Sequence, residues 1–208
     1  MKSCLEGSDC LYNVFQDEDL YMEAIIDDEL LQVDDSVENR IYPSLRYQVD
    51  STREDTLIFY YDCNYFFNDG SEIVSLTIMK YASFGEVFNY GNGLLNYAPF
   101  DSLGYEGDYS YVKRIPYLPE HGVDVRYFRN DSMIYFVDQS GSHPEDFYFH
   151  AENFIRKNDV DCYGRNIMWF NFTGNFGCRL VEQESKDTLV IRDAEFRGVI
   201  MQFRYSTF

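Results

Sequence analysis

Two runs of strand-forming residues on either side of a tight-turn sequence constrain the fold of this chain more than any other feature. The first run, Thr56 to Phe67 (TLIFYYDCNYFF), and the second, Ser71 to Tyr81 (SEIVSLTIMKY), are rich in aromatic and β-branched side chains. Between them lies Asn68-Asp69-Gly70, and an Asp-Gly pair favours the positive φ angles that a hairpin turn requires. The segment therefore predicts an antiparallel β-hairpin.

Similar segments extend the predicted sheet along the chain. Aromatic residues make up 18% of the 208 residues, whereas alanine, the best helix former, occurs only five times. The last fifty residues resemble a β-meander, with one turn expected at Gly174-Asn175. Strands are predicted at 86–90, 109–115, 123–128, 133–138, 166–173, 176–182, 188–192 and 198–205. We therefore expect an α+β fold that is predominantly antiparallel β, either a sandwich or an open barrel.

One helix is predicted within this β-rich body, at residues 144–157. Ser142 and Glu145 have the spacing of a capping box, and Pro144 stands where a proline is tolerated in a first turn. Apolar residues follow at helical spacing, and two bases stand near the expected negative end. The apolar residues are Phe147, Ala151, Phe154 and Ile155, and the bases are Arg156 and Lys157.

A second helix is predicted near residues 17–37, within an acidic N-terminal segment. Its apolar residues recur at steps of three and four, which is typical of one helix face. These residues are Met22, Ile26, Leu30, Val33 and Val37. We expect residues 1–44 to form an acidic segment with this amphipathic helix, and residues 45–208 to form the β-rich globular domain. The helix either docks on its own domain or folds into the groove of a partner.

The charge of the chain limits the partners that it can bind. Asp and Glu number 36 against 17 Lys and Arg, giving a formal net charge of −19. Residues 1–39 hold twelve acids and one base, a net of −11. Such a surface repels nucleic acid and anionic membranes and attracts basic protein surfaces. We therefore expect no direct nucleic-acid binding and no membrane binding. The sequence leaves open whether the chain forms a homo-oligomer.

Residue patterns for catalysis, metal binding or cofactor binding are weak. His143-Pro-Glu145 has the spacing of two iron ligands, yet it falls at the predicted helix cap. A Cys–His pair could be assembled from Cys162 or Cys178 with His121 or His150, but the negative charge of the chain disfavours a thiolate. We therefore expect no catalytic residues, no cofactor and no metal, and the chain is not expected to be an enzyme.

The expected function is that of an acidic protein that binds and inhibits a basic partner, of the immunity, anti-defence or viral accessory type. The alternative is a structural or virion assembly protein that oligomerises through an aromatic-rich β-domain. Five cysteines without paired spacing, and no signal-peptide pattern, favour a reducing cytoplasmic location. The residues expected to bind the partner are Ile26, Asp27, Asp28, Leu30, Asp34 and Asp35.

Overall fold

The strands of the computed structural model form one large antiparallel sheet. The structure describes residues 18–34, 41–49, 55–83, 85, 88–89, 94–95, 106–111, 121–130, 133–138, 147–160 and 166–203. The strands are β1 (Tyr21–Ile26), β2 (Glu29–Asp34), β3 (Ile41–Val49), β4 (Thr56–Phe67), β5 (Glu72–Ser83), β6 (Phe88–Asn89), β7 (Leu94–Leu95), β8 (Gly107–Asp108), β9 (His121–Arg129), β10 (Met133–Val137), β11 (Tyr148–Val160), β12 (Asn166–Glu182) and β13 (Thr188–Phe203). The main sheet has the order β2-β1-β13-β12-β10-β9-β5-β4-β3, with β11 and β8 attached beside β12, while β6 and β7 pair separately.

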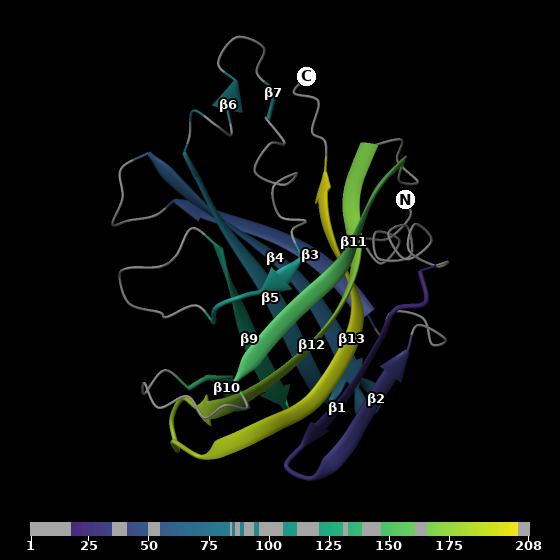
Figure 1. Ribbon diagram of the computed structural model, residues 1–208. Helices are drawn as coiled ribbons and strands as arrows, with labels where there is room; N and C mark the ends of the chain where they lie inside the picture. Colours follow the sequence, from purple (N-terminus) through teal and green to yellow (C-terminus); the bar gives the residue numbers. More distant parts are fainter. Residues whose placement is uncertain are drawn as a thin grey trace, which may run out of the picture.

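The long strand β12 makes the sheet curl, because one of its edges has two successive neighbours. Residues 166–177 of that edge pair with β11, and residues 180–182 pair with β10. Residues 107–111 join β11 to β9, because β8 pairs with β11 and Tyr111 bridges to Val123. β3, at one end of the sheet, comes close to β13, the third strand from the other end. The result is a nearly closed, barrel-like sheet (Figure 1).

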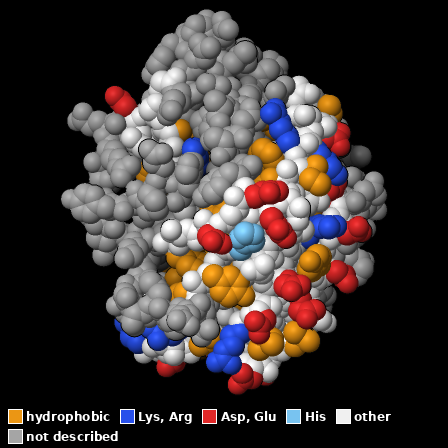
Figure 2. All heavy atoms as spheres, viewed as in Figure 1, with side chains coloured by type: hydrophobic (Ala, Val, Ile, Leu, Met, Phe, Trp, Pro, Cys, Tyr) orange, Lys and Arg blue, Asp and Glu red, His pale blue; other side chains and the backbone are white. Residues whose placement is uncertain are grey.

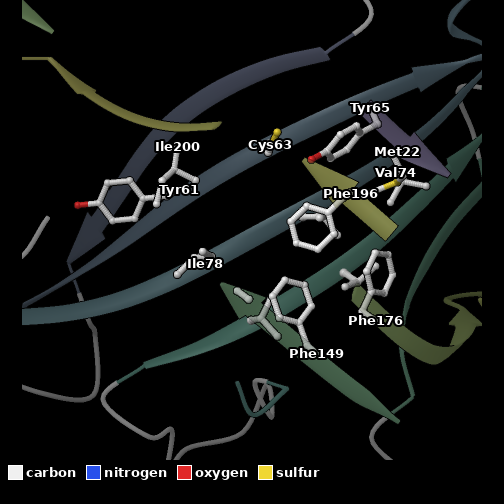
Figure 3. Close-up of a cluster of buried hydrophobic side chains, with 14 of the residues drawn as sticks. Met22, Tyr61, Cys63, Tyr65, Val74, Ile78, Phe149, Phe176, Phe196 and Ile200 are labelled. Carbon is white, nitrogen blue, oxygen red and sulfur yellow. The ribbon is translucent and has the colours of Figure 1, made fainter. Parts of the chain in front are cut away.

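Large aromatic side chains fill the interior of this sheet. Phe196 of β13 is fully buried, and its ring centroid lies 5.6 Å from that of Phe149 and 5.4 Å from that of Phe172. On β4, Tyr65 is fully buried with its ring centroid 6.5 Å from that of Phe196, and Tyr61 is fully buried farther along the strand (Figure 3). These residues alternate along their strands with outward-facing ones, as the strand geometry requires. Thirteen of the 38 aromatic residues of the chain are buried in the described core, so core packing accounts for part of the high aromatic content.

The predicted hairpin at residues 56–81 is confirmed. β4 and β5 pair from Thr56 to Phe67 without a register shift, and Asn68–Gly70 forms a short 3-10 turn between them. Asn68 and Gly70 have φ angles of 47° and 87°. The predominance of antiparallel strands is confirmed as well, and of the two expected architectures the structure has the barrel-like one.

The acidic helix predicted for residues 17–37 is wrong, because residues 21–34 form a β-hairpin. β1 and β2 pair along their whole length, and Asp27 and Asp28 form the turn with φ angles of 50° and 67°. The buried side chains alternate on each strand: Met22, Ala24, Ile26, Leu31 and Val33. Met22 and Ile26 are two strand periods apart, which equals a helical step of four, and Leu30, which continued the apparent helix face, is exposed on the other side of the turn. Asp17 and residues 35–37 lie outside the described residues.

The helix predicted for residues 144–157 is also wrong, because β11 occupies residues 148–160. Phe149 and Ala151 point into the core, and the register then shifts between Glu152 and Ile155. Asn153 has a φ angle of 56° at this bulge, and Phe154 stacks on Phe172 beyond it. A bulge inserts an extra residue into a strand, so it changed the spacing of apolar residues from two to three. Residues 144–146 lie outside the described ranges, which contain no α-helical element.

The turn predicted at Gly174-Asn175 is wrong, because β12 passes through these residues without turning. A Cβ atom on Gly174 would lie 2.4 Å from the carbonyl oxygen of His150 and 2.7 Å from the ring of Phe196. The glycine is therefore needed for the close approach of neighbouring groups, and it does not break the strand.

The N-terminal hairpin belongs to the same sheet as the C-terminal strands. β1 pairs with β13 from Tyr21 opposite Arg197 to Ile26 opposite Ile191. The boundary predicted between residues 44 and 45 falls inside β3, which pairs with β4 throughout. Glu18, the first described residue, is also buried, and its carboxylate accepts hydrogen bonds from Lys157 and Asn171.

Candidate functional site: an acidic sheet face

Two rows of paired residues cross the outer side of neighbouring strands in the order β2, β1, β13, β12, β11 and β8, and every one of these strands except β12 contributes a carboxylate. A row of directly paired residues crosses all six: Gln32, Glu23, Glu195, Asn175, His150 and Asp108. A second row, two residues away on each strand, contains Asp34, Tyr21, Arg197, Thr173 and Glu152. Directly paired residues point to the same side of a sheet. The carboxylates of these rows form what we call the acidic face: Glu23, Asp34, Asp108, Glu152 and Glu195.

All five carboxylates of the acidic face are on exposed residues. On this side of the molecule, acidic side chains gather around a histidine side chain (Figure 2). The residues between them in sequence point the opposite way, into the core, as Met22, Phe149 and Phe196 do. The alternation that builds the core therefore also sorts the acids to the outside of the sheet.

Few contacts within the acidic face offset its negative charge. The Nδ1 atom of His150 lies 2.9 Å from the carboxylate of Asp108, and Gln32 donates a hydrogen bond to Glu23 at 2.5 Å. Arg197 lies 3.9 Å from Asp19, at the border of the face. Glu23 and Glu195 face each other directly, which is unfavourable for two like charges. Five carboxylates thus share a surface with one guanidinium.

Other arginine side chains of the described chain are held by carboxylates outside the acidic face. These ion pairs are Arg46 with Asp62, Arg126 with Asp124, Arg129 with Glu72, Arg179 with Asp138 and Arg192 with Asp28. These five arginines therefore pair with carboxylates other than those of the acidic face.

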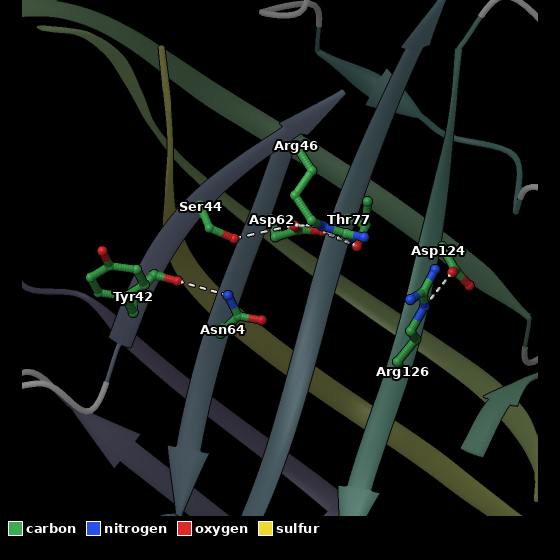
Figure 4. A network of polar contacts seen from close by, with 8 residues as sticks. All are labelled: Tyr42, Ser44, Arg46, Asp62, Asn64, Thr77, Asp124 and Arg126. Carbon is green, nitrogen blue, oxygen red and sulfur yellow. Dashed lines mark hydrogen bonds and ion pairs between the residues drawn. The ribbon is translucent and has the colours of Figure 1, made fainter. Parts of the chain in front are cut away.

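The most extensive of these pairs lies on the outer side of β3, β4 and β5 (Figure 4). Asp62 is 3% exposed and receives two hydrogen bonds from Arg46, at 2.8 and 2.9 Å. Ser44 and Thr77 donate to the same carboxylate at 3.2 and 2.7 Å. The hydrogen bond to Asp62 raises the pKa of the Arg46 guanidinium. A carboxylate saturated with four hydrogen bonds holds three strands together and is poorly suited to bind a ligand.

The residues predicted to bind a partner are spread over the N-terminal hairpin. Asp27 and Asp28 occupy its turn and are exposed, and Asp34 belongs to the acidic face. Leu30 is 56% exposed, whereas Ile26 is buried in the core. Asp35 lies outside the described residues. The hairpin brings these residues together in a different way from the predicted helix, and their role in binding stays a prediction.

The structure brings few candidate catalytic groups together. His150 contacts Asp108, but among the described residues no hydroxyl or thiol contacts His150. Burial raises the pKa of the Cys63 thiol to about 11 and raises that of Cys178 as well, so both thiols are unreactive at neutral pH. No group of three or more potential metal ligands is found within the described ranges. His143, Glu145 and Cys162 lie outside these ranges, as does the side chain of His121.

Sequence reasoning missed most of the acidic face. It anticipated Asp34 only, because the other carboxylates come from strands far apart in the chain, and their alignment depends on the register of non-local pairs. Alternation of acids with apolar residues, as at Glu195 beside Ala194 and Phe196, was the available signal.

Comparison of the chain with protein-family models, with curated proteins and with solved structures finds no match. Among the described residues, no helix has the length and apolar character needed to cross a membrane.

Proposed function

We propose that this protein is a non-enzymatic binding protein whose acidic face engages the basic surface of a partner protein and inhibits that partner. The observation that carries the proposal is the pair of residue rows that align five exposed carboxylates across six strands. A cytoplasmic partner of the immunity, anti-defence or viral accessory type fits this proposal. The free thiols of Cys63 and Cys178 support a reducing location.

The alignment of carboxylates lowers the stability of the sheet, so a requirement for stability does not explain it. Carboxylates placed directly opposite each other, as Glu23 and Glu195 are, destabilise a sheet. A rigid negative surface instead accelerates the encounter with a positive surface and disfavours partners of the wrong charge. Basic proteins use such positive surfaces to bind anions such as nucleic acid, so occupation by the acidic face would block that binding.

A competition experiment tests this proposal. A fluorescent DNA oligonucleotide bound to poly-L-lysine is titrated with the protein, and the fluorescence anisotropy reports displacement of the DNA. We expect the wild-type protein to displace the oligonucleotide, with an effect that weakens as salt rises, because exposed charges are screened over about 8 Å at 0.15 M salt.

Two matched variants separate the acidic face from net charge. The face variant carries Glu23→Gln, Glu152→Gln and Glu195→Gln, and the control variant carries Asp55→Asn, Glu184→Gln and Asp187→Asn. Both lose three negative charges, and the control residues lie in exposed turns away from the two rows. The face variant should displace DNA at least several-fold less well than the control variant. Equal losses would show that net charge alone is responsible, and the proposal would be abandoned.

A further inference from the structure

A small pocket lies at the end of the barrel where the β1–β2 turn meets β5, β9 and β13. Its volume is about 190 Å³. Asp27 comes from the hairpin turn and Glu29 from the first position of β2, while Glu72 stands at the first position of β5 and Arg129 at the last position of β9. Drug-sized ligands and cofactors occupy pockets of about 300 to 1,000 Å³, so this one fits a single side chain better.

One wall of the pocket is aliphatic. Ile26, Leu31 and Leu189 line it, and each is less than 9% exposed. Their side chains belong to the hydrophobic core, so the wall is fixed by packing. An alkyl chain that entered the pocket would lie against this wall and leave water.

The charges of the pocket leave two carboxylates in excess. Glu72 is nine-tenths buried and faces Arg129 at 3.3 Å, while Asn68 donates to its other oxygen at 2.6 Å. The charge of Arg129 is thus offset by Glu72. Asp27 receives one long hydrogen bond, at 3.4 Å from the backbone N–H of Val190, and no described residue donates to Glu29. The pocket therefore suits a cation.

We propose that the pocket receives one arginine or lysine side chain of the basic partner. The alkyl part of that side chain packs on Ile26, Leu31 and Leu189, and its charged end binds the carboxylates of Asp27 and Glu29. Lys and Arg side chains combine an apolar stem with a cationic head, which matches this division of the pocket. The inference rests on the proposed function and adds a specific anchor beside the acidic face.

The test uses the full ¹⁵N-labelled chain and a peptide with one arginine, acetyl-Gly-Ser-Arg-Ser-Gly-amide. We expect saturable amide shifts in NMR spectra at Asp27, Glu29 and Arg129. The same peptide with citrulline, which keeps the shape of arginine but lacks its charge, should give no saturable shifts. Asp27→Asn should weaken binding by roughly threefold, as expected for the loss of one partly exposed ion pair.

Asp28→Asn is the matched control for Asp27→Asn. Both aspartates have positive φ angles, which asparagine tolerates, and both changes remove one charge from the same turn. Asp28 contacts Arg192 and does not line the pocket, so its variant should bind like the wild type. Equal effects of the two changes, or equal binding of the citrulline peptide, would overturn the pocket assignment.

The two proposals can fail separately. If the arginine peptide shifts only amides of the acidic face, the pocket assignment is wrong and the acidic face keeps its proposed role. If the peptide fills the pocket while the face variant displaces DNA as well as the control variant does, the pocket assignment stands. The proposed role of the acidic face is then rejected.

Discussion

Glu23 of β1 and Glu195 of β13 lie directly opposite each other, with both carboxylates on the exposed side of the sheet. Tyr21 and Arg197, two positions further along the same strands, form a neutral–cationic pair instead. The like-charged pair costs stability at the junction between the N-terminal hairpin and the remaining sheet, so it identifies a position where binding and stability are expected to conflict.

Glu195→Lys should therefore stabilise the protein and weaken its binding to poly-L-lysine. An opposite-charge pair with Glu23 is expected to raise the free energy of unfolding by about 0.2–1 kcal/mol, measured by urea denaturation. Glu184→Lys in the β12–β13 turn makes the same charge change and should leave stability within about 0.5 kcal/mol. A destabilised Glu195→Lys variant would contradict the cross-strand repulsion.

Gly198→Ala should destabilise the core. A Cβ atom there would lie 2.5 Å from the hydroxyl oxygen of Tyr65 and 3.2 Å from the sulfur of Cys63, and both residues are fully buried. Overpacking of this kind costs about 1–3 kcal/mol. Tyr65→Phe in the Gly198→Ala background should recover part of the loss, because it removes the closest atom.

Gly85→Ala is the control for Gly198→Ala, since a Cβ atom on Gly85 meets no atom within 4 Å. Its unfolding midpoint in urea should match that of the wild type. If the two alanine variants were equally stable, the close packing of β13 against β4 would be refuted.

Asp62→Asn should weaken the pairing of β3, β4 and β5. The change removes the charge that binds Arg46 and replaces one acceptor oxygen with an amide NH2 group, so Thr77 and Ser44, which donate to different oxygens, cannot both keep their hydrogen bonds. We expect a loss of about 1–3 kcal/mol in urea denaturation, because Asp62 is buried although Arg46 is half exposed. Asp159→Asn, a similar change on an exposed strand residue, should have little effect. A neutral Asp62→Asn variant would show that the ion pair is dispensable.

Glu182 should make the β12–β13 turn sensitive to acid. Backbone N–H groups of Ser185 and Glu184 donate to its carboxylate, and these hydrogen bonds lower the pKa of Glu182. Its contribution to stability is complete above the ordinary glutamate pKa of about 4.3 and is lost as the pH falls through the lower folded value. Glu182→Gln should therefore reduce Tm at pH 7, and the difference should vanish in strong acid. A constant difference at every pH would rule out this linkage.

The strands were predictable from sequence where the pairing is local. Residues 56–81 contain both partners and the turn of one hairpin, so composition and turn chemistry were sufficient. Both predicted helices failed because residues two strand periods apart, such as Met22 and Ile26 or Phe147 and Ala151, imitate a helical step of four, and an interruption in each segment hid the period of two. Asp27-Asp28 interrupts the first segment as a turn, and the bulge at Asn153 interrupts the second. Gly174 was mistaken for a turn because the close approach of the Phe196 ring, from the next strand β13, depends on the register of the β12–β13 pair.

The acidic face was only partly predictable because it depends on register. The net charge indicated a basic partner, yet it did not show which acids share a surface. Glu23 meets Glu195 only through a pairing of residues far apart in sequence, and Glu195 meets Asn175 only through the register of the long β12–β13 hairpin. A shift of one residue in any of these strands would turn the carboxylates into the core.

The pairing of β1 with β13 has a consequence for folding kinetics. It joins residues 21–26 to residues 191–197, so loop closure makes it one of the slowest contacts to form, after the local hairpins. The acidic face is complete only once this contact exists. A partner that binds the acidic face therefore binds only the state in which β1 is paired with β13. By mass action, the partner increases the population of this paired state and slows the separation of β1 from β13. The rate of hydrogen exchange along β1 would thus measure the occupancy of the face.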